Sequence, residues 1–364
     1  MLEKDLKIFI GPSEIANVGA TIGEAFRKRG IRVTVVSKGK SPFRIGMKYD
    51  KVLSPPDIKD QNKICRIIKL VCYWSPFFLN NFFRNNSFIF LFGNTLFPKN
   101  LDLPFYKYFG KKTIMWFLGD DIKDIKLREV ELRKMGIKYF HNEAMEDNPE
   151  EKEKKIRMIH KVEKYVDYII TGPSIAHLLT RDYLGKDLSS RVYLPFDISS
   201  LKRSNLQNDK IMIVHAPSDA QIKGTKYVLD AILQLEKEGY EIDFRLLKNV
   251  PNPIVRETLS QADIAIDQLF AFGPGMFALE AMTAGCVVLG GNMPQVSGYP
   301  LELPIIRTDQ DNIYQNVKML LDNPKMIQVI GKQSRKYVEK YHDSRKIADK
   351  IVNILTIGRK VKDI

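Results

Sequence analysis

Short apolar runs alternate along the chain with longer segments in which apolar residues recur every three or four positions. The short runs predict buried strands, and the longer segments predict amphipathic helices. The first pair is the clearest, because the apolar run at residues 7–10 is followed by a Gly-Pro-Ser turn. Val18, Ile22 and Phe26 then recur at helical spacing until a glycine ends the helix. This alternation is typical of a parallel sheet whose strands are joined by crossover helices.

The same pattern predicts further elements along the rest of the chain. Strands are expected at residues 31–37, 88–92, 113–118, 166–171, 211–215, 243–247, 264–267 and 287–290. Helices are expected at about residues 225–238 and 277–284, and two more within residues 323–361. Residues 124–164 are rich in charge and mostly helical in pattern, with a polar interruption at residues 141–149.

The apolar pattern lapses into serine, asparagine and charged residues at residues 197–210, where we expect a linker. The fold class is therefore α/β, with two Rossmann-like, doubly wound domains that face a cleft. The first spans residues 1–200 and the second residues 201–345, and a C-terminal helix follows at residues 346–364. We expect the C-terminal helices to cross back to the N-terminal domain. Such folds bind ligands at the carboxyl ends of their strands.

Length and composition agree with two ordinary globular domains. The chain has 364 residues, of which 44% are hydrophobic, and it contains no apolar run long enough to span a membrane. Its first residues do not resemble a secretory signal, so the expected compartment is the cytoplasm. Cys65, Cys72 and Cys286 are its three cysteines, which argues against a disulfide scaffold or a structural zinc site.

The positive charge is concentrated in the N-terminal half. The net charge is +14, and residues 1–200 hold 35 basic and 24 acidic side chains. An anionic partner is therefore expected there. The sequence has no nucleic-acid-binding motif, so we expect a phosphate-bearing substrate or an anionic membrane surface. Residues 61–92 place basic beside aromatic side chains, which fits either a membrane-surface segment or a core helix followed by a buried loop.

Two segments carry candidate chemistry. Residues 270–285 predict a turn with glycines flanking a proline, and then a helix. Glycines let backbone N–H groups approach an anion, and a helix N-terminus favours negative charge, so a pyrophosphate fits here. Glu280 would accept hydrogen bonds from a ribose diol; the alternative is a tight turn with a capping or solvated glutamate. In residues 218–224, Lys223 would bind a phosphate, unless it is simply solvated.

Together, about fifty residues apart, these segments resemble the donor-binding domain of retaining glycosyltransferases of the GT-B fold, family 4 type. Residues 215–225 (HAPSDAQIKGT) look like the family's phosphate-lysine loop, and residues 273–291 look like its glycine loop and Glu-Ala-Met helix. Residues 194–197 (LPFD) are similar to the segment that precedes the family's linker. Residues 11–30 and 93–112 resemble the acceptor-domain loop with its first helix and the segment before the fourth strand.

The resemblance implies transfer of a sugar from a nucleotide-diphosphate donor, with retention at the anomeric carbon. It implies that Lys223 holds the diphosphate and Glu280 the ribose, and we take Asp121 as a third candidate catalytic residue. The other donor-side candidates are Ser218, Gly224, Phe272, Gly273, Pro274, Gly275, Met276 and Phe277. The acceptor-side candidates are Gly11, Pro12, Asn17, Asn94, Thr95, Gly119 and Asp120. One of the two adjacent aspartates is expected to cap the next helix or to orient an acceptor hydroxyl.

The chain departs from the family pattern at several positions. The family usually has an acidic residue eight positions before the helix glutamate, and Phe272 stands there. A basic residue often precedes the phosphate lysine by three to five positions, and here it is absent. Residues 88–93 and 116–121 lack the histidines that related strands often carry. These departures leave open an altered donor sugar or a domain that binds without turnover.

The sequence therefore predicts a retaining glycosyltransferase that moves a sugar from a nucleotide-diphosphate donor to a glycan or lipid-linked acceptor, in the synthesis of a cell-surface polysaccharide or glycolipid. It is expected in the cytoplasm, peripheral on the inner face of the membrane, with no nucleic-acid partner. No metal or cofactor is expected beyond the nucleotide sugar as co-substrate. The alternatives are a non-catalytic GT-B homologue that supports a partner enzyme, and a sugar-nucleotide epimerase or hydrolase of the same fold.

Overall fold

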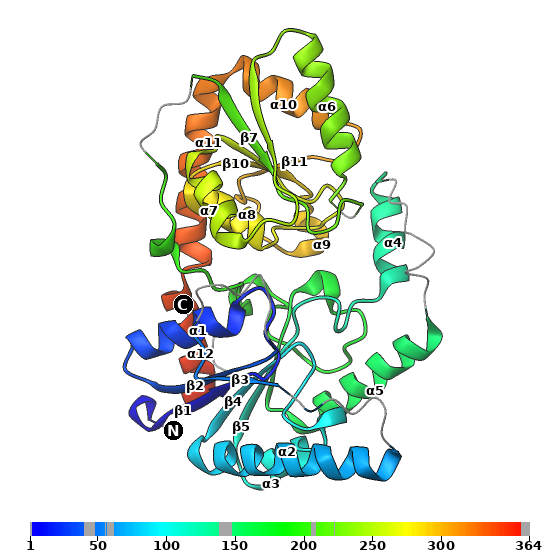
Figure 1. The fold of residues 1–364 in the computed structure, drawn as a ribbon, viewed down its shortest axis with the longest axis vertical. Coiled ribbons are helices and arrows are strands. Elements are labelled where there is room, and N and C mark those ends of the chain that lie inside the picture. Colours follow the sequence, from blue (N-terminus) through cyan, green and yellow to red (C-terminus); the bar gives the residue numbers. More distant parts are fainter. Residues whose placement is uncertain are drawn as a thin grey trace. The chain divides into compact units, whose positions relative to one another are not determined.

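Two parallel β-sheets, each covered by helices, organise the computed structural model of the chain (Figure 1). The structure describes residues 2–39, 48–54, 56, 62–137, 148–204, 209–221 and 223–357. The chain divides into two units. The first contains Met1–Asp124, Asp147–Val192 and Arg345–Ile364, and the second contains Ile125–Glu146 and Tyr193–Ser344. Each unit is described separately below.

The first unit has a six-stranded sheet in the order β3-β2-β1-β4-β5-β6. Its strands are β1 (Lys7–Ile10), β2 (Arg32–Lys38), β3 (Lys51–Leu53), β4 (Ser87–Leu91), β5 (Lys112–Trp116) and β6 (Tyr168–Ile170). Its helices are α1 (Val18–Lys28), α2 (Lys63–Arg84), α3 (Leu103–Tyr108), α5 (Pro149–Tyr165) and α12 (Ser344–Ile357). All pairings are parallel, and β1 lies between β2 and β4 in the sheet.

The second unit has a five-stranded parallel sheet in the order β11-β10-β9-β7-β8. Its strands are β7 (Ile211–His215), β8 (Ile242–Leu246), β9 (Ile264–Ile266), β10 (Val287–Gly290) and β11 (Ile305–Arg307). Its helices are α4 (Ile125–Lys134), α6 (Thr225–Lys237), α7 (Asn252–Gln261), α8 (Met276–Ala284), α9 (Pro294–Ser297), α10 (Ile313–Asp322) and α11 (Pro324–Tyr341).

Aromatic side chains fill the core of the first unit. Phe88 and Phe90 of β4 are fully buried, and the ring of Phe88 lies 4.5 Å from that of Tyr106 on α3, measured between centroids. Helix α2 adds Trp74, Phe78 and Phe82, which recur every four residues and are buried. Because residues four apart share one face of a helix, α2 is a core helix along this face. It continues without a break through Pro76 to Arg84.

The second unit has two cores, one on each face of its sheet. Successive side chains of a strand point to opposite faces. Ile213 and Ile264 accordingly join the core under α6 and α10, whereas Val214 and Ala265 join the core under α7, α8 and α11. The first of these cores also contains Leu132 of α4.

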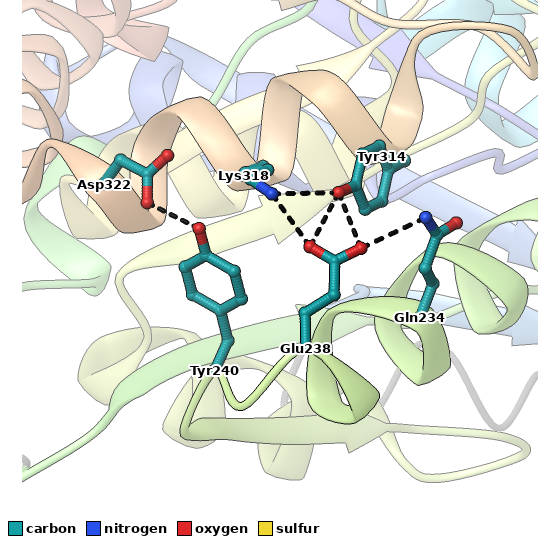
Figure 2. A network of polar contacts seen from close by, with 6 residues as sticks. All are labelled: Gln234, Glu238, Tyr240, Tyr314, Lys318 and Asp322. Carbon is teal, nitrogen blue, oxygen red and sulfur yellow. Dashed lines mark hydrogen bonds and ion pairs between the residues drawn. The ribbon is translucent and has the colours of Figure 1, made fainter.

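A polar network also connects α6 with α10 at the edge of the unit (Figure 2). The carboxylate of Glu238 accepts hydrogen bonds from the Tyr314 hydroxyl and the Lys318 ammonium group, both at 2.8 Å. The hydroxyl of Tyr240 donates to Asp322 at 2.7 Å. These polar side chains are near the surface, where ion pairs contribute little stability. The apolar contacts between α6 and α10 therefore hold the two helices together more strongly than this network does.

The sequence predicted the fold class correctly. All nine expected strands are present within two residues of the expected positions, and the tail forms two helices, of which the last belongs to the first unit. The three-residue strands β3 and β11 were missed, as were α3, α7, α9 and α10. The polar interruption at residues 141–149 lies mostly outside the described residues. Of residues 61–92, α2 buries Trp74, Phe78 and Phe82 as the core-helix alternative expects, and the segment after it is the buried strand β4 in place of a loop.

Within the described residues, no helix is both long and apolar enough to cross a lipid bilayer.

Candidate functional site

The strand order of the second unit places a switch point between β7 and β9. These strands are neighbours, but the chain leaves β7 toward β8 on one side and returns to β9 on the other. Loops after two such strands separate, and ligands of doubly wound folds bind in the crevice between them. The loops at this position are residues 216–224 and 267–275, which include most of the predicted donor-side residues.

Lys223 and Asp267 form a buried ion pair across this switch point. The Nζ of Lys223 contacts Oδ1 of Asp267, and their side chains are only 11% and 3% exposed. The same Nζ lies 5.7 Å from the ring centroid of Phe277 on α8. The lysine charge is therefore held between the end of β9 and the first turn of α8, and it is not simply solvated.

Gly224 shapes the loop that carries Lys223. Its φ of +72° lies in the left-handed region, and a Cβ at this position would come within 2.8 Å of the Leu269 side chain. Both features exclude a larger residue without strain. Ser218 is exposed on the same loop.

His215 supports the site from beneath. It is fully buried at the end of β7, where Nδ1 lies 2.8 Å from the Ile266 carbonyl oxygen and Nε2 lies 2.9 Å from Oγ1 of Thr225. A carbonyl oxygen only accepts, so Nδ1 carries the proton and Nε2 accepts from the threonine hydroxyl. Burial, helped by the charge of Lys223, lowers the pKa of His215 to about 4. The imidazole is thus a neutral structural group.

The N-terminus of α8 opens beside the ion pair. Gly275 precedes the helix without a side-chain cap, and the first turn has no acidic residue. A Cβ on Gly275 would lie 3.5 Å from Oδ2 of Asp267, so this helix end adjoins the carboxylate that holds Lys223. The first backbone N–H groups of a helix have no intrahelical partner and favour an anion. Lys223 and these N–H groups therefore place several donors together, while the Asp267 carboxylate offsets part of their positive charge.

Glu280 lies one turn further along α8. Its side chain is 7% exposed, and both carboxylate oxygens accept from Nδ2 of Asn252, at 3.0 and 3.3 Å. Burial raises the pKa of Glu280, while the bond from Asn252 and the charge of Arg256 oppose this shift. Asn252 thus fixes the orientation of a carboxylate near the helix N-terminus.

Phe272 is packed against an arginine of helix α4. Its buried ring lies 5.7 Å from the guanidinium carbon of Arg128, and Nη2 of Arg128 donates to the Phe270 carbonyl oxygen at 2.7 Å. Arg128 comes from α4, more than 140 residues earlier in the chain. It therefore braces the loop that leads to Gly273 and α8. A Cβ on Gly273 would approach the Tyr299 ring at 2.8 Å, so this loop is also closely packed on that side.

In the first unit, the N-terminus of helix α1 is capped by a carboxylate of the preceding loop. The carboxylate of Glu14 accepts from the N–H groups of Gly19 and Ala20, at 3.0 and 2.9 Å. Gly11 adopts a φ of +132°, and a Cβ there would overlap the Val36 carbonyl oxygen. The predicted acceptor-side residues Gly11, Pro12 and Asn17 thus form a packed turn after β1, at the switch point between β1 and β4.

The turn after β4 carries the next pair of acceptor-side candidates. Thr95 is buried, and its backbone N–H donates to Oδ1 of Asn100 at 3.0 Å, while its hydroxyl donates to Asp102. Asn94 is exposed, with its Nδ2 donating to the Phe92 carbonyl oxygen at 2.6 Å. Thr95 therefore has a structural position, and Asn94 is the one that faces solvent.

Asp120 and Asp121 follow β5 and differ in their surroundings. Asp120 is exposed and forms an ion pair with Lys123 at 2.8 Å. Asp121 is buried and accepts from the N–H groups of Gly119, at 2.8 Å, and Leu118. Burial raises the pKa of Asp121 to about 6, because it penalises the charged form more than these bonds stabilise it. In the part of the chain that the structure describes, no cluster of three or more metal-ligating side chains is found.

The structure thus brings Lys223, Gly275 and Phe277 together around Asp267, and it places Glu280 one turn away. The sequence analysis missed Asp267, Asn252 and Arg128. Asp267 could have been found, because it is the last residue of a predicted strand, at the end where doubly wound folds place their functional residues.

No family model and no curated protein matches the sequence. Solved structures do match the fold. Sucrose-phosphate synthase from Thermosynechococcus elongatus aligns with a TM-score of 0.65 at 11% identity, over 95% of this chain and 97% of that one. WaaG, a glycosyltransferase involved in lipopolysaccharide biosynthesis, aligns with a TM-score of 0.56 at 12% identity, over 96% of this chain and 100% of that one. A putative UDP-N-acetylglucosamine 2-epimerase from Listeria monocytogenes aligns with a TM-score of 0.58 at 12% identity, over 99% of this chain and 98% of that one.

Two parallel-sheet α/β units with these strand orders define the GT-B fold, and the chain has this fold. At such low identity the similarity is one of fold, so activity has to be argued from the site itself.

Proposed function

We propose that the chain is a retaining, nucleotide-sugar-dependent glycosyltransferase of the family 4 type. It would move a sugar from a nucleotide-diphosphate donor to a glycan or lipid-linked acceptor, in the synthesis of a cell-surface polysaccharide or glycolipid. The observation that carries the proposal is the position of Lys223, whose charge is held by Asp267 beside the open N-terminus of α8. Two of the three structural neighbours described above, a synthase and a glycosyltransferase, are consistent with it.

Donor binding follows from the charges at this point. The diphosphate would lie against the first N–H groups of α8 and within reach of the Lys223 ammonium group. Asp267 keeps that ammonium group at the mouth of the loop, so little ordering is needed when the donor binds. Glu280, whose carboxylate Asn252 orients, would accept hydrogen bonds from the ribose diol. Met276 and Phe277 would line the donor between these two groups.

Catalysis would depend on stabilising the departing diphosphate. In the front-face reaction the acceptor hydroxyl attacks the anomeric carbon, and a phosphate oxygen of the leaving group takes the hydroxyl proton. Lys223 and the α8 N–H groups would stabilise the negative charge that develops on the diphosphate. The buried ring of Phe272 offers no carboxylate to the sugar, so we propose an altered donor sugar at this position. Asp121, Asp120 and Asn94 would contribute to the acceptor side.

The proposal extends to the surroundings of the enzyme. The reaction needs no metal and no cofactor besides the co-substrate, and nucleic acid is not among the proposed partners. A lipid-linked acceptor would place the protein peripherally on the inner face of a membrane.

The first experiment is thermal unfolding in the presence of UDP-, GDP-, ADP- and dTDP-sugars. A ligand at a hundred times its dissociation constant stabilises the folded protein by about 2.7 kcal/mol, which raises the melting temperature measurably. Lys223→Ala and Glu280→Gln should each weaken donor binding by about 1.5–3 kcal/mol, because each removes a charge-assisted contact. Lys226→Ala and Glu236→Ala, at exposed positions of α6, are the matched controls and should bind like the wild type.

The products then decide between the candidate activities. Sugar transfer to an added acceptor, with slow hydrolysis in its absence, supports the transferase. Release of an epimerised sugar would instead support the epimerase alternative, whose fold the chain shares. Stabilisation without any turnover would indicate a binding homologue. If no sugar nucleotide stabilises the protein, the donor site is wrongly assigned.

A further inference from the structure

Exposed aromatic side chains gather on helices α2 and α3 of the first unit. Phe83 is 76% exposed, Phe105 54%, Tyr108 84% and Phe109 59%, and Leu79 beside them is 50% exposed. We call these five residues the aromatic patch. Single exposed apolar residues are ordinary on a protein surface, but a group of large ones marks an interaction site.

The patch is one continuous surface. The ring centroids of Phe83 and Phe109 lie 5.6 and 5.4 Å from that of the buried Phe82. The ring of Phe105 lies 6.2 Å from that of Phe78, one turn earlier in α2. The exposed rings of both helices are therefore supported by the same buried aromatic pair and keep fixed positions.

An apolar stripe continues the patch along α2. Ile68 and Val71 are 55% and 47% exposed, and with Leu79 and Phe83 they lie within about 120° of one another around the helix axis. Trp74, Phe78 and Phe82 are buried on the adjoining part of the helix surface, about 80° around the axis. Helix α2 is thus apolar over one wide arc, of which the core of the first unit covers only part.

The segment that carries the patch is strongly basic in sequence. Residues 62–119 contain eight basic residues and a single acidic one, Asp102. Those whose side chains the structure describes are Lys69, Arg84, Lys99, Lys107, Lys111 and Lys112. Asp102 is 1% exposed and accepts hydrogen bonds from the Leu96 N–H and the Tyr106 hydroxyl within the fold. On this segment, therefore, no carboxylate at the surface offsets the lysines and arginines.

We propose that the aromatic patch, with Ile68, Val71 and the surrounding basic residues, docks the protein on an anionic lipid surface. Aromatic side chains favour the interface between headgroups and acyl chains, and lysine and arginine beside them attract anionic headgroups. Charge complementarity favours an anionic lipid surface, because a neutral apolar partner would gain no binding energy from the basic residues. The inference rests on the proposed function, in which the acceptor is lipid-linked, and it names the surface that would bring the enzyme to that acceptor.

The test is co-sedimentation of the full chain with vesicles of phosphatidylcholine alone or with about 30% phosphatidylglycerol. The wild type should bind the anionic vesicles, and binding should fall as salt is raised from about 0.05 to 0.5 M. The variant Phe83→Ser/Phe105→Ser/Phe109→Ser should lose about tenfold or more of its vesicle affinity. Arg84→Gln/Lys107→Gln should lose the preference for anionic vesicles. Leu229→Ser/Leu233→Ser, on an exposed part of α6, is the control and should bind like the wild type.

Three results would overturn the proposal. The wild type could fail to bind anionic vesicles, it could bind neutral vesicles equally well, or both patch variants could bind like the wild type. If the patch instead joins two copies of the chain, sedimentation velocity would show a dimer that the aromatic variant loses, with no vesicle binding. Stabilisation by sugar nucleotides, measured on the same samples, reports the donor site independently. Lost stabilisation with retained vesicle binding would contradict the proposed function alone.

Discussion

At the scale of single residues, the most sharply defined titrating group behind the donor site is His215. Its imidazole is neutral because burial penalises the charged form, and the charge of Lys223 adds to this effect, while the hydrogen bond to the Ile266 carbonyl opposes it. The net result is a pKa lowered from 6.5 to about 4. An unfolded chain takes up this proton below pH 6.5, whereas the folded chain resists it until about pH 4. The contribution to stability is thus fully present above pH 6.5 and is lost as the pH falls toward 4.

We expect this group to lower the free energy of unfolding by about 2 kcal/mol between pH 7 and pH 5. His215→Asn keeps an N–H donor for the Ile266 carbonyl but cannot titrate, so its stability should fall less over this range. Chemical denaturation at several pH values measures the difference. Asp121, with its pKa raised to about 6, acts with the opposite sign, since its contribution is lost as the pH rises through 6. The contribution of Asp121 is the same in the wild type and in His215→Asn, so it cancels when their pH dependences are compared.

His160→Asn, at an exposed position of α5, is the control for loss of an imidazole. If His215→Asn and the wild type lost stability in parallel between pH 7 and pH 5, the buried neutral imidazole would not be the cause.

In each interacting pair of the site, the sequence analysis identified one residue and missed its partner. Lys223 and Gly275 lie in turns between a predicted strand and a predicted helix, so local pattern and the family resemblance both point to them. Asp267 is 44 residues from Lys223, and the two meet only because β7 and β9 are neighbours in the sheet. Asn252 reaches Glu280 in the same way, from the start of α7. Local periodicity carries no information about which strands or helices become neighbours.

At the scale of elements, α4 is the helix whose role the sequence did not reveal. It follows the first five strands along the chain, yet its Leu132 lies in a core of the second unit and its Arg128 braces residues 270–272. Its amphipathic pattern is weak, because it contains six charged residues in ten. The few contacts that place it are tertiary, so periodicity alone could not assign it. The short strands β3 and β11 were also missed, although β6 and β9, which are equally short, were recognised.

We expect Arg128→Ala to weaken sugar-nucleotide binding by about 1–3 kcal/mol, because it removes a charged donor from the Phe270 carbonyl and a cation from the Phe272 ring. The residue touches the loop that carries Gly273, not the donor, so the effect would come from lost order in that loop. Arg128→Lys should recover only part of the affinity, since a lysine lacks the planar guanidinium. Donor titration by calorimetry gives the dissociation constants.

Arg133→Ala removes an arginine of the same helix that is 70% exposed, and it should leave binding unchanged. If Arg128→Ala also bound normally, α4 would not brace the glycine loop.

At the scale of the whole molecule, the chain passes between the two units more than once, and its last helix belongs to the first. Residues 193–344 complete the second unit before α12 returns. The return is anchored by polar contacts to early parts of the chain, since Lys350 donates to the Arg191 carbonyl at 2.6 Å and Asp349 pairs with Arg29. The side chains of α12 that are at most 3% exposed are Ile347, Ala348, Ile351, Val352, Ile354 and Leu355.

Ending the chain after Asp343 should therefore unfold the first unit selectively. Each large aliphatic side chain contributes about 1.5–3 kcal/mol by its burial, so the loss of α12 approaches the 5–15 kcal/mol that stabilises an ordinary domain. The cores on the two faces of the second sheet contain no residue of α12. Limited proteolysis with mass spectrometry should accordingly find cleavage throughout residues 2–124 and protection of residues 209–343, while a chain ended at Ile357 should resist cleavage in both units. Equal protection of the two units in the shorter chain would mean that α12 is dispensable. Selective loss would show that the N-terminal unit needs the last helix of the chain to be stable.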